Sequence, residues 1–74
     1  MGVSTDMLAA FTKVAELASV SAAAQELGLP KSVVSKRIAQ LEHLVQATLF
    51  SRSTRRIALT SAGVIYLDFA RSAL

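Results

Sequence analysis

The chain is too short and too poor in reactive side chains for most catalytic or metal-binding functions. It has 74 residues, no cysteine and one histidine, so it has no thiolate ligand or disulfide, and a lone histidine cannot hold a metal ion. Its scattered acids do not supply a nucleophile with a positioned base. We therefore expect one small domain that is not an enzyme and binds no cofactor. Its thin core should depend on a partner subunit or a longer parent chain.

Nothing in the sequence indicates a membrane segment, although 53% of the residues are hydrophobic. No apolar run is long enough to span a bilayer, and the first residues, MGVSTDM, lack the basic and apolar regions of a signal peptide. We therefore expect a soluble, cytoplasmic protein without a membrane partner.

The positive charge is concentrated in the middle of the chain, although the net charge is only +3. Between residues 31 and 56 there is one acid, Glu42, and the six basic residues Lys31, Lys36, Arg37, Arg52, Arg55 and Arg56. Clustered cations favour a polyanion such as double-stranded DNA, because phosphate contacts release counterions. A solvated charged face is the alternative interpretation.

The first predicted helix follows the capping candidates Ser4, Thr5 and Asp6. Apolar residues then recur at three- and four-residue steps from Met7 to Ala18, which is the spacing of one buried helix face. Phe11 and Val14 are predicted to lie in the core.

Residues 20–39 have the pattern of a helix-turn-helix. A short helix is predicted from an N-cap at Ser21 through Leu27, with the small Ala24 where two helices cross. Gly28 can take the left-handed conformation that ends a helix, and Pro30 can open the next one. An antiparallel helix pair in a small bundle is the alternative. The Ser21 hydroxyl could also donate to a phosphate, although a cap is the safer interpretation.

The third helix is predicted over about Lys31 to Val45. Apolar residues at spacings of four, three and four form its buried face, namely Val34, Ile38, Leu41 and Val45. At about 100° per residue the opposite face is centred on Ser32, Lys36, Ala39 and His43.

In a helix-turn-helix the N-terminal end of this second helix lies deepest in the major groove of DNA. Ser32, Ser35 and Lys36 are therefore the candidates for contacts with base edges. Arg37 falls on the flank of the buried face, where it could reach a phosphate or pack against the first helix. His43 is expected to be a solvated surface histidine.

Two short strands are predicted at about residues 48–59, because apolar residues at Leu49, Phe50, Ile57 and Leu59 bracket a polar turn. Such a wing commonly reaches the adjacent groove or its backbone, where arginine is favoured. The candidate DNA contacts in this segment are Arg52, Thr54, Arg55 and Arg56. Arg55 and Arg56 would alternate in direction on a strand, so one of them could face away from DNA.

Thr60 is the predicted cap of a last helix whose apolar residues cover too much of the circumference for one buried face. An exposed apolar patch on a small soluble domain usually marks an interface. We therefore expect a two-fold homodimer through this helix, with the candidate contacts Ile65, Leu67, Phe69 and Leu74.

These residues together resemble the N-terminal DNA-binding domain of LysR-type transcriptional regulators. The resemblance rests on the segments Phe11-x-x-Val14-Ala15-Glu16, Ser19-x-Ser21-x-Ala23-Ala24-x-x-Leu27, Ser32-x-Val34-Ser35-Lys36-x-Ile38-x-x-Leu41-Glu42, Leu49-Phe50-x-Arg52 and Thr60-x-Ala62-Gly63. It implies a mainly α, winged helix-turn-helix fold with a three-helix core, a two-stranded wing and a C-terminal linker helix. The expected division is a DNA-binding domain at 1–59 and the start of a linker and dimerisation helix at 60–74.

The resemblance also implies bacterial transcription control, with base and phosphate contacts at Lys31, Ser32, Ser35 and Lys36 and on the wing arginines. A small-molecule inducer would bind only a further domain that this chain does not include. The chain departs from many members at Pro30 and Lys31, where a hydroxyl and Gln are common, and at Lys36, where Arg is common. The preferred DNA sequence therefore cannot be carried over. A winged helix that docks proteins without binding DNA is the remaining alternative.

Overall fold

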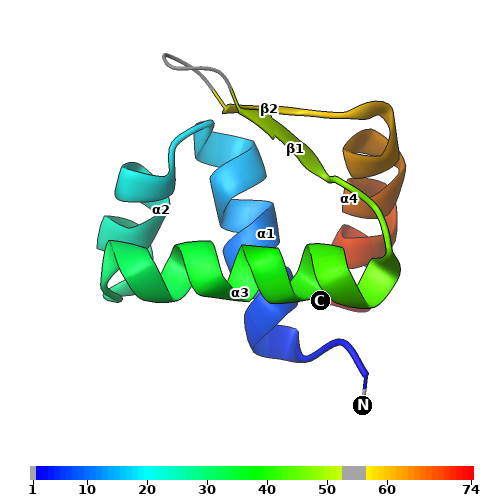
Figure 1. Ribbon diagram of the computed structural model, residues 1–74. Helices are drawn as coiled ribbons and strands as arrows, with labels where there is room; N and C mark the ends of the chain where they lie inside the picture. Colours follow the sequence, from blue (N-terminus) through cyan, green and yellow to red (C-terminus); the bar gives the residue numbers. More distant parts are fainter. Residues whose placement is uncertain (1, 53–56) are drawn as a thin grey trace.

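The computed structural model describes residues 2–52 and 57–74 and shows a winged helix-turn-helix (Figure 1). The elements follow in the order α1 (Thr5–Leu17), α2 (Val20–Leu27), α3 (Lys31–Val45), β1 (Phe50–Arg52), β2 (Ile57–Leu59) and α4 (Ser61–Ala73). The predicted fold class is confirmed, and α3 has the bounds expected from the sequence. The predicted contacts Thr54, Arg55 and Arg56 lie outside the described residues.

The core forms where α1 packs against both α2 and α3. The predicted core residues Phe11 and Val14 of α1 are fully buried, as are Val34, Ile38 and Leu41 on the inner face of α3. Each such side chain contributes about 1.5–3 kcal/mol through the area removed from water. The predicted inner face of α3 is therefore confirmed, except that Val45 is only partly buried at its end.

Short polar side chains begin three of the helices. Ser4 accepts the backbone N–H of Met7 at the start of α1, and Thr60 accepts that of Gly63 at the start of α4. The predicted cap at Ser21 is wrong, because Ser19 caps α2. Ser19 has an extended backbone and its hydroxyl accepts the N–H of Ala22 at 3.0 Å, so the helix has already begun at Val20.

Gly28 and Pro30 have the roles predicted for them in the turn between α2 and α3. Gly28 ends α2 with φ 69° and ψ 34°, in the left-handed region, where glycine has no steric penalty. Pro30 then begins α3 from an extended conformation, and its carbonyl accepts the N–H groups of Val33 and Val34. This turn fixes the angle at which α3 leaves α2.

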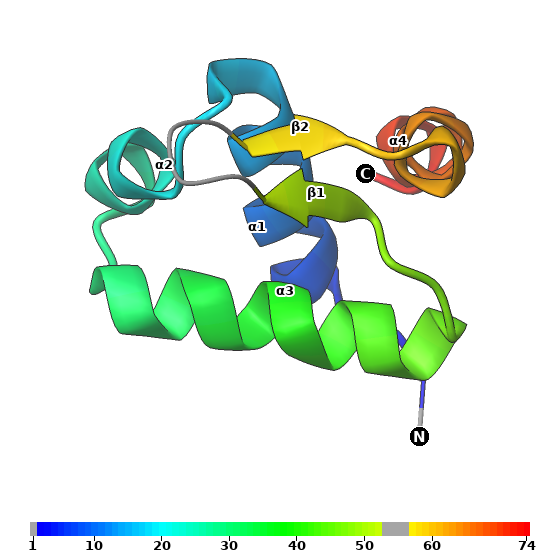
Figure 2. The same cartoon turned by 45° about the horizontal axis from the view of Figure 1, so that its top comes forward.

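The two strands pair antiparallel, with Phe50 opposite Leu59 and Arg52 opposite Ile57, which confirms the two-stranded wing. Figure 2 shows β1 running back above α3, with β2 on its far side and α4 seen end on. The start of α4 packs closely on this hairpin, since a Cβ added at Gly63 would collide with the carbonyl oxygen of Leu49. The first turn of α4 therefore requires a residue without a side chain.

Aromatic rings connect the wing, the core and α4. The ring of Phe11 lies 5.3 Å from that of Phe50 and 5.6 Å from that of Tyr66, which in turn lies 5.3 Å from Phe69. These are the tilted and edge-on arrangements that aromatic pairs prefer. Burial raises the pKa of the Tyr66 phenol above its usual value of 10.0, because the phenolate is the poorly solvated form.

Within residues 2–52 and 57–74, none of the helices combines the length and the apolar character needed to cross a membrane. The same described residues contain no cluster of three or more side chains suited to holding a metal ion.

Candidate nucleic-acid interface

The outer face of α3 is open to solvent along its length and carries exposed cations in its N-terminal half. Lys31, Ser32 and Lys36 are exposed near its N-terminal end, and Ala39 and His43 are exposed further along the same face. No acid lies in the first turn, so the partial positive charge at the helix N-terminus is not neutralised locally. The face predicted from periodicity is confirmed, and it combines cations with a helix end that favours anions.

Two of the candidate contact residues lie at the margin of this face. Ser35 and Arg37 are half-buried, so each presents only part of its side chain to a molecule lying along α3. The position of Arg37 agrees with its predicted place on the flank of the buried face. A phosphate at the side of the helix is more accessible to it than a base edge beneath the helix.

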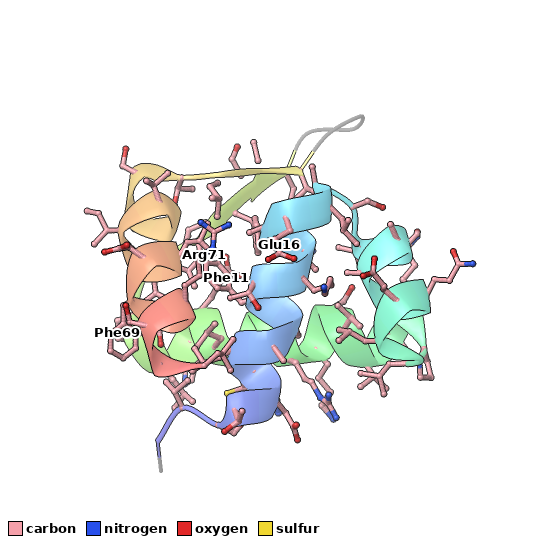
Figure 3. The ribbon with its side chains drawn as sticks, turned by 180° about the vertical axis from the view of Figure 1, so that it is seen from behind. Phe11, Glu16, Phe69 and Arg71 are labelled. Carbon is pink, nitrogen blue, oxygen red and sulfur yellow. The ribbon has the colours of Figure 1, made fainter. Side chains whose placement is uncertain are left out.

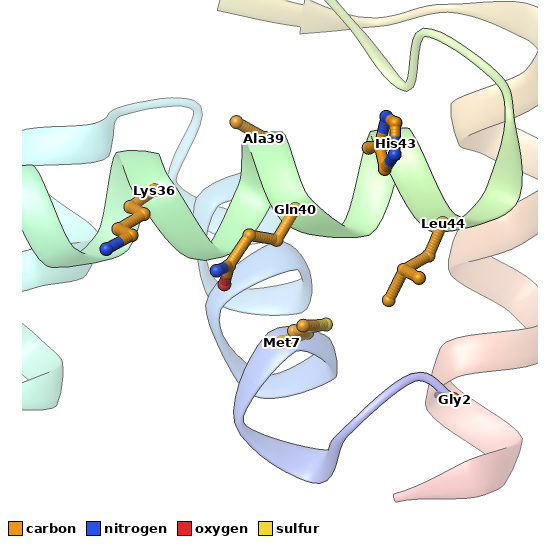
Figure 4. Close-up of a pocket in the computed structure, with 7 residues that line it drawn as sticks. All are labelled: Gly2, Met7, Lys36, Ala39, Gln40, His43 and Leu44. Carbon is orange, nitrogen blue, oxygen red and sulfur yellow. The ribbon is translucent and has the colours of Figure 1, made fainter.

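A shallow groove lies between the outer face of α3 and the start of α1. Lys36, Ala39, Gln40, His43 and Leu44 line it from α3, and Gly2 and Met7 line the other side. Figure 4 shows Lys36 and Gln40 projecting from successive turns of α3 on the same side. Sequence reasoning missed Gln40. The available signal was its four-residue spacing from Lys36 and a side-chain amide, which can pair with adenine.

The remaining candidate contacts flank α3 on two sides. Ser21 is exposed in the first turn of α2, and because Ser19 provides the cap, the Ser21 hydroxyl is not committed to that role. Arg52 is exposed at the end of β1. The rest of the predicted wing contacts fall on residues outside the described ranges.

Glu42 is the only acid of α3, and its carboxylate is turned toward the wing. Its Oε2 accepts the backbone N–H of Leu49 at 2.8 Å and that of Phe50 at 3.1 Å. The negative charge is thereby bound to two amides at the start of β1, away from the exposed cations of α3. The sequence identified Glu42 as a charge and as part of a family-like segment, but not this contact, because the partners of its carboxylate are seven and eight residues away.

The outward side of α4 carries several exposed large apolar side chains. Its exposed apolar side chains are Val64 at 58%, Ile65 at 75%, Phe69 at 57% and Leu74 at 55% of their maximal area. Figure 3 shows Phe69 directed away from the body of the molecule. Leu67 differs from the other candidate interface residues, because it is half-buried and packs against the core of its own domain.

Residues 5–64 match the sequence model of the bacterial regulatory helix-turn-helix proteins of the LysR family. The chain belongs to this family. The match crosses residue 60, so the expected division into 1–59 and 60–74 stays a prediction. An HTH-type transcriptional regulator of Xanthomonas campestris pv. campestris is 52% identical over 56 residues, which cover 76% of this chain and 16% of that protein. The chain thus spans only a small part of such a relative.

Solved structures of the family have the same fold. The peroxide-bound C206S mutant of Corynebacterium glutamicum OxyR superimposes with a TM-score of 0.95 at 30% identity, covering 99% of this chain and 23% of that chain. Vibrio fischeri DarR, solved in complex with DNA, gives a TM-score of 0.93 at 32% identity, covering 99% and 25%. The described helices and strands therefore have the arrangement found in these two proteins.

Proposed function

We propose that this chain is the DNA-binding region of a bacterial transcriptional regulator and recognises a specific double-stranded sequence. The observation that carries the proposal is the outer face of α3, where exposed cations and hydroxyls occupy the helix that follows the turn of a helix-turn-helix. The fold similarity to DarR, a family member solved with DNA, supports it. A module that only docks proteins would not need a cationic face without exposed acids.

The positions of the side chains suggest separate roles. Ser32, Ser35 and Lys36 would face base edges in the major groove, together with Gln40 one turn beyond Lys36. Lys31, Arg37 and Ser21 would contact backbone phosphates beside the groove. The wing, represented among the described residues by Arg52, would lie on the adjacent groove or on the sugar-phosphate backbone.

Selection of bound duplexes from a random pool tests the proposal directly. We expect enrichment of one half-site sequence, with an affinity that falls steeply as salt concentration rises, because cations on the protein displace counterions from phosphates. Lys36→Ala should weaken the preference for the selected sequence. Lys13→Ala removes the same charge from α1 and should leave that preference unchanged. If no duplex sequence were enriched, and if the amount of bound duplex did not depend on salt concentration, the protein-docking alternative would be favoured.

We also propose that two copies associate through α4 in the cytoplasm. Ile65, Phe69 and Leu74 supply exposed apolar surface on one helix, and a two-fold pair would present two α3 helices to half-sites about one DNA turn apart. Leu67 would contribute at the edge, since it already packs on its own core. An inducer would act through a domain outside this chain.

Sedimentation across a concentration series, with and without a palindromic duplex, tests this assembly. Two protein chains per duplex are expected, and Ile65→Ser should weaken that assembly more than Leu17→Ser, which changes an exposed apolar residue of α1. A saturated complex of one chain per duplex, with no dimer at any concentration, would contradict the proposed pairing.

A further inference from the structure

We infer that Glu42 is a positioning residue, whose carboxylate fixes the direction of the wing relative to α3 and so allows both to contact one DNA duplex. The inference rests on the DNA-binding function proposed above. It assigns to an acid within the cationic segment a role in binding a polyanion, although charge alone would oppose such binding.

The connection between α3 and β1 is held by Glu42 at three backbone amides. The Glu42 carbonyl accepts the N–H of Ala47 at 3.2 Å, and the carboxylate accepts those of Leu49 and Phe50. Leu49 and Phe50 are buried, at 1% and 4% exposure. If the carboxylate were removed, these amides would lose their hydrogen-bond partner, and burial would keep water from replacing it. A buried unsatisfied group costs about 1–3 kcal/mol.

The opposite side of the same segment is attached to the start of α4. The carbonyl of Leu49 accepts the N–H of Thr60 at 3.0 Å, and that of Thr48 accepts the Thr60 hydroxyl. Among the described residues, β2 packs against α4, and the Leu49 carbonyl lies close to Gly63 in the first turn of α4. In the part of the chain that the structure describes, Glu42 is thus a polar link between α3 and a hairpin that also packs on α1 through Phe50 and on α4.

Burial of Leu49 and Phe50 cannot by itself set the direction of β1. Apolar contact is non-directional, whereas a carboxylate that binds two successive amides restricts both the position and the angle of the strand. β1 runs back toward the beginning of α3 (Figure 2) and ends at Arg52. A change of its angle would therefore move Arg52 relative to Lys36, and one duplex could not be contacted by both.

A double-mutant cycle on DNA binding tests this role. In the wild type, Arg52→Ala should lower the affinity for the selected duplex. It should also reduce the salt slope, which is the slope of log affinity against log salt concentration, by about one. In Glu42→Ala, the further change Arg52→Ala should have little effect on either quantity, because the arginine is no longer held on the duplex. Glu42→Gln, which keeps an acceptor oxygen but loses the charge, should retain most of the Arg52 effect.

Glu16→Gln is the matched control for charge. Glu16 is exposed on α1, on the face turned away from α3 (Figure 3), and lies 3.4 Å from Lys13 Nζ. In the Glu16→Gln background, Arg52→Ala should lower the affinity and the salt slope as much as it does in the wild type. Amide hydrogen exchange in the free protein should be faster at Leu49 and Phe50 in Glu42→Ala than in Glu42→Gln. If Glu42→Ala does not fold, Glu42→Asp replaces it, because the shorter side chain cannot reach both amides.

The outcomes separate the two proposals. A wild-type chain that binds no duplex would remove the DNA-binding function itself. A wild type that binds, with effects of Glu42→Ala and Arg52→Ala that simply add, would overturn the positioning role alone. The role would also be overturned if Arg52→Ala left the affinity and salt slope of the wild type unchanged, since no wing contact would then depend on the strand's direction.

Discussion

Replacing Gly63 by alanine tests whether α4 must lie in close contact with the start of the wing. The added Cβ would collide with the carbonyl oxygen of Leu49 and lie 2.9 Å from Cδ2 of Leu59. The Leu59 side chain can move, but the Leu49 carbonyl is held by the N–H of Thr60 at 3.0 Å. The backbone of the hairpin or of α4 would have to shift.

The expected magnitude follows from three contributions. Overpacking in a fitted site costs about 1–3 kcal/mol, and weakening the Thr60 to Leu49 hydrogen bond costs about 0.5–1.5 kcal/mol. The higher helix propensity of alanine offsets up to about 1 kcal/mol. We therefore expect Gly63→Ala to lower the free energy of unfolding by about 2 kcal/mol, which corresponds to a fall in Tm of about 10 °C for a domain of this size.

Urea unfolding followed by circular dichroism measures this difference. Ser61→Ala is the matched control, because Ser61 is exposed in the same first turn of α4 and should change the free energy of unfolding by less than about 0.5 kcal/mol. If Gly63→Ala proved as stable as the wild type or more stable, helix propensity would dominate and the close contact with Leu49 would not constrain the fold.

Three further predictions concern a helix end, a phenol and the two kinds of DNA contact. Ala18 ends α1 with φ 52°, so Ala18→Gly should raise the free energy of unfolding by about 0.5–1 kcal/mol, and Ala22→Gly inside α2 should lower it; equal losses in both would contradict the strain at Ala18. Tyr66 is the only tyrosine, and its raised pKa means that its phenol ionises at higher pH in the folded than in the unfolded chain. Stability linked to it is present below pH 10 and is lost as pH rises through the folded-state pKa; tyrosinate absorbance should show this, and an unshifted titration would count against burial of the phenol. Lys36→Ala should change which sequence is preferred, at a cost of about 1–3 kcal/mol on the best site if the contact is to a base, whereas Arg52→Ala should weaken binding to all sequences alike. Competition binding against mutated duplexes distinguishes them, and the reverse pattern would show that the roles of helix and wing are exchanged.

The sequence by itself determined the features that depend on neighbours within one helical turn. The spacing of Val34, Ile38 and Leu41 defined the buried face of α3, and hence the exposed face with Lys36, because both follow from 3.6 residues per turn. Gly28 and Thr60 could be assigned from local backbone conformation and capping alone. The family could also be named from the order of such local signals along the chain.

Only the tertiary structure decided which of several locally equivalent residues is used and where distant partners meet. Ser19 and Ser21 are both suitable caps, and the path of the chain from α1 selects Ser19. Leu67 and Ile65 are both large aliphatic residues of α4, but the packing of α4 on α1 half-buries Leu67 and leaves Ile65 exposed. The carboxylate of Glu42 meets the amides of Leu49 and Phe50 only because the chain reverses after α3, and such a contact between separate elements leaves no periodic signal in the sequence.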